Sequence, residues 1–422
     1  MGKRDSWEQC VKKLKRFSRK FVSKLVEKFG PIRVLFCVKN EIGFGSQAPL
    51  MALMEKNPLF KMASVKVTSE KLNFSDSDMQ SLFDRHSISE KKARFSVWHY
   101  VVATDKRYLW LSWDSVGVHL MHGSCFGNGR RSRIEHKPWA QQEAEQDNVA
   151  ICICSGQGVY EGLMGISHDF RSDSKKAFLI AGSPKLADLA NGAYDRTSVL
   201  LSLGLDPRLK TVLVSSHWTE MSLLRDLDTL VVQLLLGWKD ELNIIVTGHP
   251  KLWRLTPAEP SFDGQALLSR LQLLSEEYSD RLRICPTGHP FELMAASDII
   301  LCDHSSIRVE FSLLDRPAGL YRNKNFICES KTTDELYRNS SEVFHDIDSL
   351  ELVLKEILSP DYENTASIRN LRHFFMMNPS RGAKKIVNFL AECGRVSSPE
   401  SSRWKRVKQL ENDHLIEDLQ QY

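Results

Sequence analysis

An aspartate, a histidine and two serines stand side by side at Asp303, His304, Ser305 and Ser306, within ILCDHSSIRVEFSLLDRP. These residue types could make a hydrolytic triad or an anion site. A triad needs members that converge from separate parts of the fold, which near neighbours in one chain cannot do, and the chain has no GxSxG elbow. The stretch passes from an apolar run into a helical pattern, so both serines should lie at a helix start. Free backbone N–H groups and two hydroxyls suit a phosphate there, and this use is compatible with plain N-capping.

Polar residues also follow three other apolar runs. In HLMHGSCFGNGRRSR, His122 comes directly after such a run, and Gly123 allows the backbone to approach a ligand closely. Three cations of that stretch could attract an anionic ligand or form an exposed basic loop: Arg130, Arg131 and Arg133. In IIVTGHP and ICPTGHP, His249 and His289 each precede a proline. We expect His249 to lie at the mouth of a strand and His289 to cap the helix that follows.

The sequence contains few other motifs that are typical of a catalytic or metal site. No P-loop and no GxGxxG occurs, which disfavours a kinase or a dehydrogenase. DxD triplets at 76–78, 226–228 and 346–348 fall at helix starts or within helices, so we interpret them as caps and solvated charge. The histidines lack local metal-ligand spacing, and we predict neither a metal site nor a cofactor. The nine cysteines include no CxxC pair, which is typical of a reduced, cytosolic chain.

Alternating strands and helices must position these groups. Strands are expected at IRVLFCV, YLWLSWDSV, NVAICICS and KKAFLIAGS, then at TVLVSS, LNIIVTG, LRICP, DIILCD and PAGLY. Helices are expected between them, for example after a glycine turn in GFGSQAPLMALMEK and over 223–238. This order predicts an α/β fold with parallel sheets. The turn-rich stretch 186–210 is expected to cross between two domains.

We therefore predict two Rossmann-like domains that face a central cleft. The predicted boundaries are 1–30 for an N-terminal helix, 31–195 and 196–395 for the two domains, and 396–422 for a partly helical tail. Ligands of open parallel sheets bind outside the carboxyl ends of the strands, where the four polar stretches fall. The net charge of +4 is far from that of a dedicated nucleic-acid binder, so no nucleic-acid partner is predicted.

The first thirty residues form a basic amphipathic pattern. One helical face carries apolar side chains: Trp7, Val11, Leu14, Phe17, Phe21, Leu25 and Phe29. The other face carries cations: Lys12, Lys13, Lys15, Arg16, Arg19, Lys20, Lys24 and Lys28. Such a helix can lie in the plane of an anionic membrane, where each cation contributes about 1 kcal/mol. It could instead pack its apolar face on its own protein. No signal peptide and no spanning helix is expected.

Taken together, the motifs resemble a known family. MHGS, AGSPKLADL, VTGHP and ASDIILCDHSSIRVEFSLLDRPAGLY occur in the order seen in the CDP-glycerol glycerophosphotransferases of teichoic acid synthesis. The resemblance covers roughly Arg33 to Glu392 and is strongest from Ser297 to Tyr321. It implies a GT-B-like fold, with an acceptor-side first domain and a nucleotide-donor second domain. It also implies a protein at the inner face of the cell membrane with a lipid-linked or glycan acceptor.

The resemblance assigns roles to residues that match. His122 matches a histidine of the family that acts as a base on the acceptor hydroxyl. His249 matches a histidine that lies near the donor phosphates. Ser305 and Ser306 match hydroxyls that bind the pyrophosphate. The other donor-site residues that we carry over are Asp303, Glu310, Gly123 and Ser124.

The sequence also departs from the family pattern. His304 replaces a tyrosine, Glu310 an aspartate, Ser124 a threonine, and His217-Trp218-Thr219 stands for Thr-Trp-Arg. We expect transfer of a polyol phosphate from a CDP-alcohol. The alternatives are a glycosyltransferase that uses a nucleotide-activated sugar, with Glu310 on a ribose or sugar hydroxyl, and a non-catalytic membrane-associated nucleotide- or glycan-binding protein.

Overall fold

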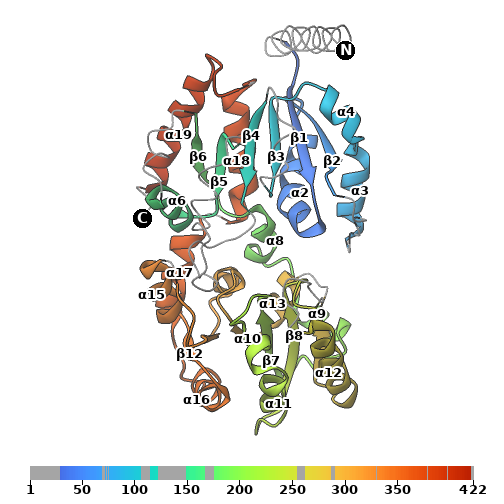
Figure 1. The fold of residues 1–422 in the computed structure, drawn as a ribbon, viewed down its shortest axis with the longest axis vertical. Helices are drawn as coiled ribbons and strands as arrows, with labels where there is room; N and C mark the ends of the chain where they lie inside the picture. Colours follow the sequence, from blue (N-terminus) through green and yellow to red (C-terminus); the bar gives the residue numbers. More distant parts are fainter. Residues whose placement is uncertain are drawn as a thin grey trace, which may run out of the picture.

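Two α/β domains, joined by two crossings of the chain, make up the computed structural model (Figure 1). It describes residues 29–68, 72, 74, 76–105, 115–121, 149–166, 175–253, 262–286, 290–328, 330–377, 379–396 and 398–419. The predicted helix over residues 1–28 and the stretch 122–148 lie outside these described residues. The predicted fold class is confirmed: each domain is built on a parallel sheet of six described strands.

The first sheet has the strand order β2-β1-β3-β4-β5-β6. Its strands are β1 (Ile32–Val38), β2 (Phe60–Lys66), β3 (Tyr100–Ala103), β4 (Val116–Leu120), β5 (Ile151–Cys154) and β6 (Ala177–Ile180). Its helices are α2 (Glu41–Glu55), α3 (Ser77–His86), α4 (Glu90–Phe95) and α6 (Gln157–Ile166). Strand β1 packs Leu35 into one core cluster and Phe36 into another. Because both of its faces are buried, it appears in the sequence as a continuous apolar run.

The second sheet has the order β12-β11-β10-β7-β8-β9. Its strands are β7 (Lys210–Ser216), β8 (Leu242–Gly248), β9 (Leu282–Cys285), β10 (Ile299–Cys302), β11 (Ala318–Tyr321) and β12 (Glu342–Phe344). Its helices are α10 (Leu223–Leu227), α11 (Leu230–Leu236), α12 (Gly264–Glu277), α13 (Pro290–Ala296), α14 (Ile307–Phe311), α15 (Lys331–Asn339), α16 (Ile347–Ile357) and α17 (Thr365–Phe375), with a 3-10 turn η3 (Ser312–Leu314) after α14.

The two crossings are short helical segments. The first contains η2 (Pro184–Leu186), α8 (Ala187–Ala190) and α9 (Arg196–Ser202). Of these, α8 and α9 lie inside the stretch 186–210 that was predicted to cross between domains, and η2 begins two residues before it. The second contains η4 (Pro379–Arg381) and leads into α18 (Gly382–Cys393) and α19 (Trp404–Leu419). The carboxyl ends of both sheets point toward the region where the domains meet (Figure 1).

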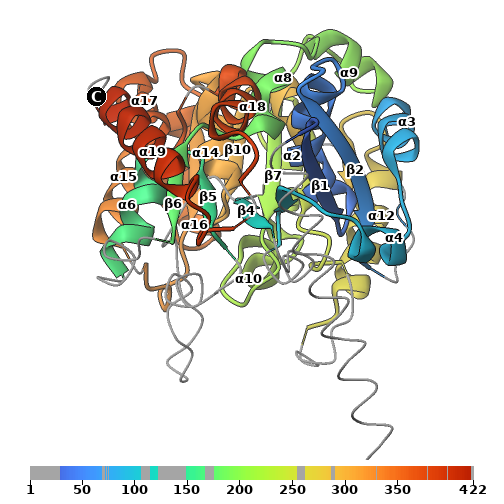
Figure 2. The same cartoon turned by 90° about the horizontal axis from the view of Figure 1, so that it is seen from above.

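Helices α18 and α19 return to the first domain, where both views place them against the first sheet (Figures 1 and 2). Their apolar side chains, including Phe389 and Val407, belong to the same core cluster as Phe36. The Tyr100 hydroxyl donates to the Gly394 carbonyl at 2.8 Å. This differs from the predicted boundary at residue 395, because an amphipathic pattern shows that a face is buried but not which sheet covers it. No helix in the described ranges is long and apolar enough to cross a bilayer.

Two helix predictions also differ from the structure. The expected glycine turn after β1 is part of α2, which begins at Glu41 because Asn40 caps it by accepting a hydrogen bond from the Gly43 N–H at 2.9 Å. The single helix expected over 223–238 is two helices, α10 and α11. Asp228, at the end of α10, has a φ of 52°, which no α-helix contains.

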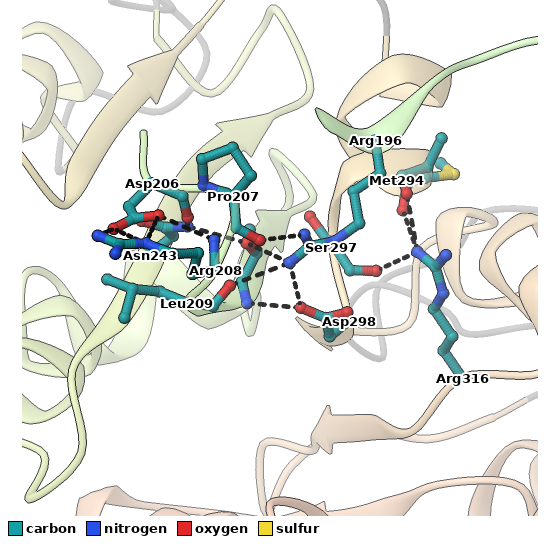
Figure 3. Close-up of polar contacts among 12 residues, drawn as sticks. Arg196, Asp206, Pro207, Arg208, Leu209, Asn243, Met294, Ser297, Asp298 and Arg316 are labelled. Carbon is teal, nitrogen blue, oxygen red and sulfur yellow. Dashed lines mark hydrogen bonds and ion pairs between the residues drawn. The ribbon is translucent and has the colours of Figure 1, made fainter. Parts of the chain in front are cut away.

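A polar network fixes the amino ends of β7 and β10 (Figure 3). Arg196 donates to the carbonyls of Pro207 at 2.7 Å and Leu209 at 3.0 Å, and pairs with Asp298 at 2.9 Å. Asp298 also accepts from the Thr211 N–H at 2.8 Å. These contacts tie α9 to the two central strands, so their carboxyl ends are held in a defined register.

Candidate functional site

The carboxyl ends of β7 and β10 mark the switch point of the second sheet. From β7 the chain continues outward through β8 and β9, and from β10 it continues the other way through β11 and β12. Crossover connections therefore leave in opposite directions between these two strands, which is where ligands of open parallel sheets bind. The predicted stretch 303–306 begins directly after β10, so the structure places it at this point.

Asp303 is fully buried and links the two central strand ends. Its Oδ2 accepts hydrogen bonds from the Ser216 hydroxyl at 3.1 Å, the His217 N–H at 2.8 Å and the Leu223 N–H at 3.1 Å. These three donors belong to the end of β7 and the start of α10. Asp303 therefore holds the loop between β7 and α10, rather than offering this oxygen to the phosphates we predicted for it.

Three imidazoles gather at the ends of three neighbouring strands. His217 follows β7, His249 follows β8, and His304 follows β10. The ring centre of His217 lies 5.6 Å from that of His249 and 5.5 Å from that of His304. We call these three residues the imidazole cluster. Within the described part of the chain, no group of three or more His, Cys, Asp or Glu side chains is arranged to hold a metal ion.

Thr219 connects two members of the imidazole cluster. Its Oγ1 lies 2.9 Å from His217 Nδ1 and 3.2 Å from His304 Nε2. Its backbone N–H donates to His217 Nδ1 at 3.3 Å. The threonine is buried, so its hydroxyl makes these contacts away from bulk water.

His249 is held by its own loop. Its backbone N–H donates to the Ser216 carbonyl at 3.0 Å, and its Nδ1 accepts from the Lys251 N–H at 3.1 Å. Trp218 lies beside it, with ring centres 6.0 Å apart. The Lys251 ammonium lies 4.2 Å from the centre of the Trp218 ring, a cation–π contact. A positive charge is thus held next to the imidazole cluster.

Ser305 and Ser306 are half-buried at the start of α14. Ser306 occupies the N-cap position but makes no capping hydrogen bond with its side chain. The simple capping role that we considered is therefore not what this structure shows for Ser306. The Ser305 carbonyl accepts from the Tyr337 hydroxyl at 3.3 Å, which fixes the backbone rather than the serine hydroxyl.

Arg308 is fully buried one turn further along α14. Its Nε donates to the Ser341 hydroxyl at 2.6 Å and its Nη2 donates to the Ser340 carbonyl. Burial lowers the pKa of this guanidinium, and a buried cation is stabilised by a negative charge nearby. No described carboxylate forms an ion pair with it within 4.0 Å. This charge makes the start of α14 more favourable for an anion.

Glu310 lies in a different setting from the one predicted. Its carboxylate pairs with the Lys185 ammonium at 2.6 Å, and the two side chains are only 5% and 9% exposed. Lys185 belongs to η2, so the pair connects the first crossing to α14 of the second domain. Glu310 Oε1 makes this ion pair, and its contact with a donor stays a prediction.

A pocket opens beside the imidazole cluster, between β11 and α15. It is lined by His304, Tyr321, Arg322, Phe326, Thr333 and Tyr337, among others. The His304 ring stacks on Phe326 with centres 4.6 Å apart and planes 30° apart. The lining of this pocket is largely apolar and aromatic, with the Arg322 and Asp334 side chains at its polar part.

Several predicted site residues lie outside the described residues: His122, Gly123, Ser124, Arg130, Arg131, Arg133 and His289. All of these residues except His289 lie between the described ranges 115–121 and 149–166. The last described residue before them is Met121, which is buried and directly follows β4. In contrast, His217 and Thr219 were seen in the sequence only as departures from a family pattern. Their positions directly after the apolar run TVLVSS are the signal that identifies them as residues of the site.

Comparisons with known proteins were made for the whole chain. No protein-family model matches it, and no curated protein matches it. Solved structures do: the wall teichoic acid polymerase TagF has a TM-score of 0.59 at 13% identity, over 97% of this chain and 99% of that chain. The fold is GT-B-like. Two other solved structures share this fold. One is a putative UDP-N-acetylglucosamine 2-epimerase from Listeria monocytogenes, with a TM-score of 0.55 at 11% identity, and the other is S. aureus MnaA with UDP, with a TM-score of 0.56 at 12% identity. Each match covers 85% of this chain and 95% of that chain.

Proposed function

We propose that this protein is a transferase that takes a polyol phosphate, such as glycerol phosphate, from a CDP-alcohol and passes it to an acceptor hydroxyl. The imidazole cluster at the switch point is the observation that carries this proposal. Imidazole N–H groups, two serine hydroxyls and the Lys251 and Arg308 cations surround one strand edge. Such a set stabilises the charge of a diphosphate. The Asp303 carboxylate at the same edge is buried, and its Oδ2 accepts hydrogen bonds from the loop after β7.

The proposed reaction divides the work between the domains. The acceptor oxygen attacks the phosphorus that carries the polyol, its proton passes to His122, and the bond from that phosphorus to the CMP oxygen breaks. His249, Ser305 and Ser306 bind the diphosphate and stabilise the departing CMP. The protein contributes positioning and charge stabilisation. The likeness to TagF, a teichoic acid polymerase by name, supports this choice of substrate class.

The acceptor is proposed to be lipid-linked or a glycan at the inner face of the cell membrane. Residues 3–28 would bind the anionic lipid surface, since their sequence combines an aromatic face with a basic one. Flotation with vesicles containing anionic lipid tests this step. The full chain should float with the vesicles and a chain lacking residues 3–28 should not; equal flotation of both would rule out the anchor.

A nucleotide-activated sugar is the second candidate donor. The likeness to a UDP-N-acetylglucosamine 2-epimerase and to MnaA with UDP favours it, because both names refer to uridine nucleotides. In that reaction a glycosidic bond would form, and the nucleotide would leave from a sugar carbon. A non-catalytic nucleotide- or glycan-binding protein would bind without turnover.

A donor screen separates these functions. CDP-glycerol, CDP-ribitol, CMP-sugars and UDP-sugars are each incubated with the protein and a membrane extract that supplies acceptors, and the released nucleotide (CMP or UDP) is measured. We expect CMP from a CDP-alcohol and about 10²- to 10⁴-fold less of it from a folded His122→Ala variant. Release only from sugar donors would favour the glycosyltransferase. Binding without release from any donor would favour the non-catalytic protein, and His122→Ala with unchanged turnover would contradict the assigned base.

A further inference from the structure

The hydrogen-bonded chain through His217, Thr219 and His304 has a direction that can be deduced. The Thr219 backbone N–H donates to His217 Nδ1 at 3.3 Å, and a backbone N–H can only donate. His217 Nδ1 therefore carries a lone pair and no proton. The Thr219 Oγ1, 2.9 Å from the same nitrogen, must then donate its own proton to it.

This direction extends to His304. Since the Thr219 hydroxyl proton is directed at His217, its oxygen is left to accept, and His304 Nε2 at 3.2 Å must donate to it. The order is thus His304 Nε2–H to Thr219 Oγ1–H to His217 Nδ1. In neutral His217 the remaining ring proton lies on Nε2.

The tautomer of His249 can be deduced in the same way. The Lys251 N–H donates to His249 Nδ1 at 3.1 Å, so the proton of the neutral ring lies on Nε2 there too. Two rings with centres 5.6 Å apart therefore both carry Nε2–H. A metal ligand or a general base would need a lone pair at Nε2, whereas an anion needs the N–H.

We propose that His217 binds a phosphate group of the donor through Nε2–H, and that Thr219 and His304 are positioning residues that fix its tautomer and orientation. This deepens the proposed function and rests on it for the identity of the donor. The Lys251 ammonium over Trp218 agrees with an anionic ligand beside the cluster. The Arg322 guanidinium, near the Phe326 ring on which His304 stacks, is already paired with Asp334. The same three positions are ones at which the sequence departs from the family pattern, and in the structure they contact one another.

A pair of substitutions at one position isolates the hydroxyl. Thr219→Val keeps the shape of the side chain but removes the proton donor, whereas Thr219→Ser restores it. His304→Phe keeps an aromatic ring to stack on Phe326 and removes the Nε2–H. Binding of CMP, CDP-glycerol and inorganic pyrophosphate to the full chain is measured by calorimetry, and circular dichroism checks the fold of each variant.

The expected result is about tenfold weaker binding of the phosphate probes by Thr219→Val and by His304→Phe, with affinity regained by Thr219→Ser. Wild-type affinity in folded Thr219→Val or His304→Phe would overturn the proposal, as would no binding of any probe to the wild-type chain. Because His304→Phe is a separate variant, misfolding of Thr219→Val would leave the test decisive. Pyrophosphate binding that follows this pattern, without CMP release from any donor, would support this inference while refuting the proposed transfer.

Discussion

At the scale of single residues, neighbours in one motif have different tasks. Asp303 is buried and accepts three hydrogen bonds, whereas Ser305 and Ser306 are half-buried at the helix start. A sequence motif places all of them at one strand end. It does not show which side chain turns inward, because that depends on donors supplied by the loop after β7.

Asp303→Ala should therefore affect stability before it affects any ligand. The substitution leaves two backbone N–H groups without their acceptor, whereas the Ser216 hydroxyl keeps the His217 carbonyl at 3.1 Å. Each lost acceptor costs about 1–3 kcal/mol. We expect the free energy of unfolding to fall by at least about 2 kcal/mol, measured by urea denaturation.

Asp195→Ala is the matched control for Asp303→Ala. Asp195 is an exposed N-cap of α9 whose carboxylate accepts from the Ser198 N–H at 2.7 Å and from the Ser198 hydroxyl. Its removal should cost about 1 kcal/mol. An Asp303→Ala chain as stable as the Asp195→Ala chain would show that the buried aspartate does not hold the loop.

At the scale of elements, the two glycines of α2 have unlike surroundings. A Cβ on Gly43 would meet Thr104 Oγ1 at 2.6 Å and Asn40 Oδ1 at 3.1 Å, whereas a Cβ on Gly45 would meet no atom within 4 Å. Gly43 is thus needed for the close approach of α2 to the loop after β3. Gly45 lies in an ordinary helical turn, where alanine is the better helix former.

The pair Gly43→Ala and Gly45→Ala should change stability in opposite directions. Gly45→Ala is expected to raise the free energy of unfolding by about 0.5–1 kcal/mol. Gly43→Ala is expected to lower it, because Thr104 is β-branched and must shift to make room. Denaturant titrations of both variants check this, and changes of the same sign would contradict the helical start at Glu41.

At the scale of the whole molecule, the two domains share one apolar core cluster, which contains Leu35 of β1 and Ile300 of β10, and several specific contacts. The Met377 N–H donates to the Ser155 carbonyl at 2.8 Å, and a Cβ on Gly156 would lie 2.3 Å from the Phe375 backbone. The buried Lys185–Glu310 pair adds a charged contact between the first crossing and α14. Through α14, the position of Ser305 and Ser306 is coupled to the first domain.

Removing one charge of the Lys185–Glu310 pair should lower the free energy of unfolding more than removing both charges. Glu310→Gln leaves the Lys185 ammonium buried without its partner, and we expect a loss of about 3–5 kcal/mol in the free energy of unfolding. A Lys185→Met, Glu310→Leu double variant removes both charges and should recover most of it. The exposed pair Lys355–Glu351, at 2.7 Å, is the control and should contribute less than about 1 kcal/mol. Equal, small effects for both pairs would show that the inter-domain pair is not buried in solution.

Much of this architecture can be predicted from the sequence, for identifiable reasons. Strands such as β1 and β7 are buried on both faces and therefore appear in the sequence as apolar runs. His249 and Ser305, which follow β8 and β10, lie at the expected edge of the sheet. The imidazole cluster could not be predicted, because it joins three strand ends whose order in the sheet differs from their order in the chain. The return of α18 to the first sheet could not be predicted either, because the strands on which it packs are distant from it in the sequence.

Hydrogen exchange measured with and without saturating CMP tests the central claim, a nucleotide donor site at the carboxyl edge of the second sheet. We predict slower exchange in peptides that cover residues 216–224, 248–253 and 303–311, with peptides over 60–86 of the first domain as the unchanged internal reference. Protection confined to the first domain, or none at a CMP concentration at which calorimetry shows binding, would contradict the account.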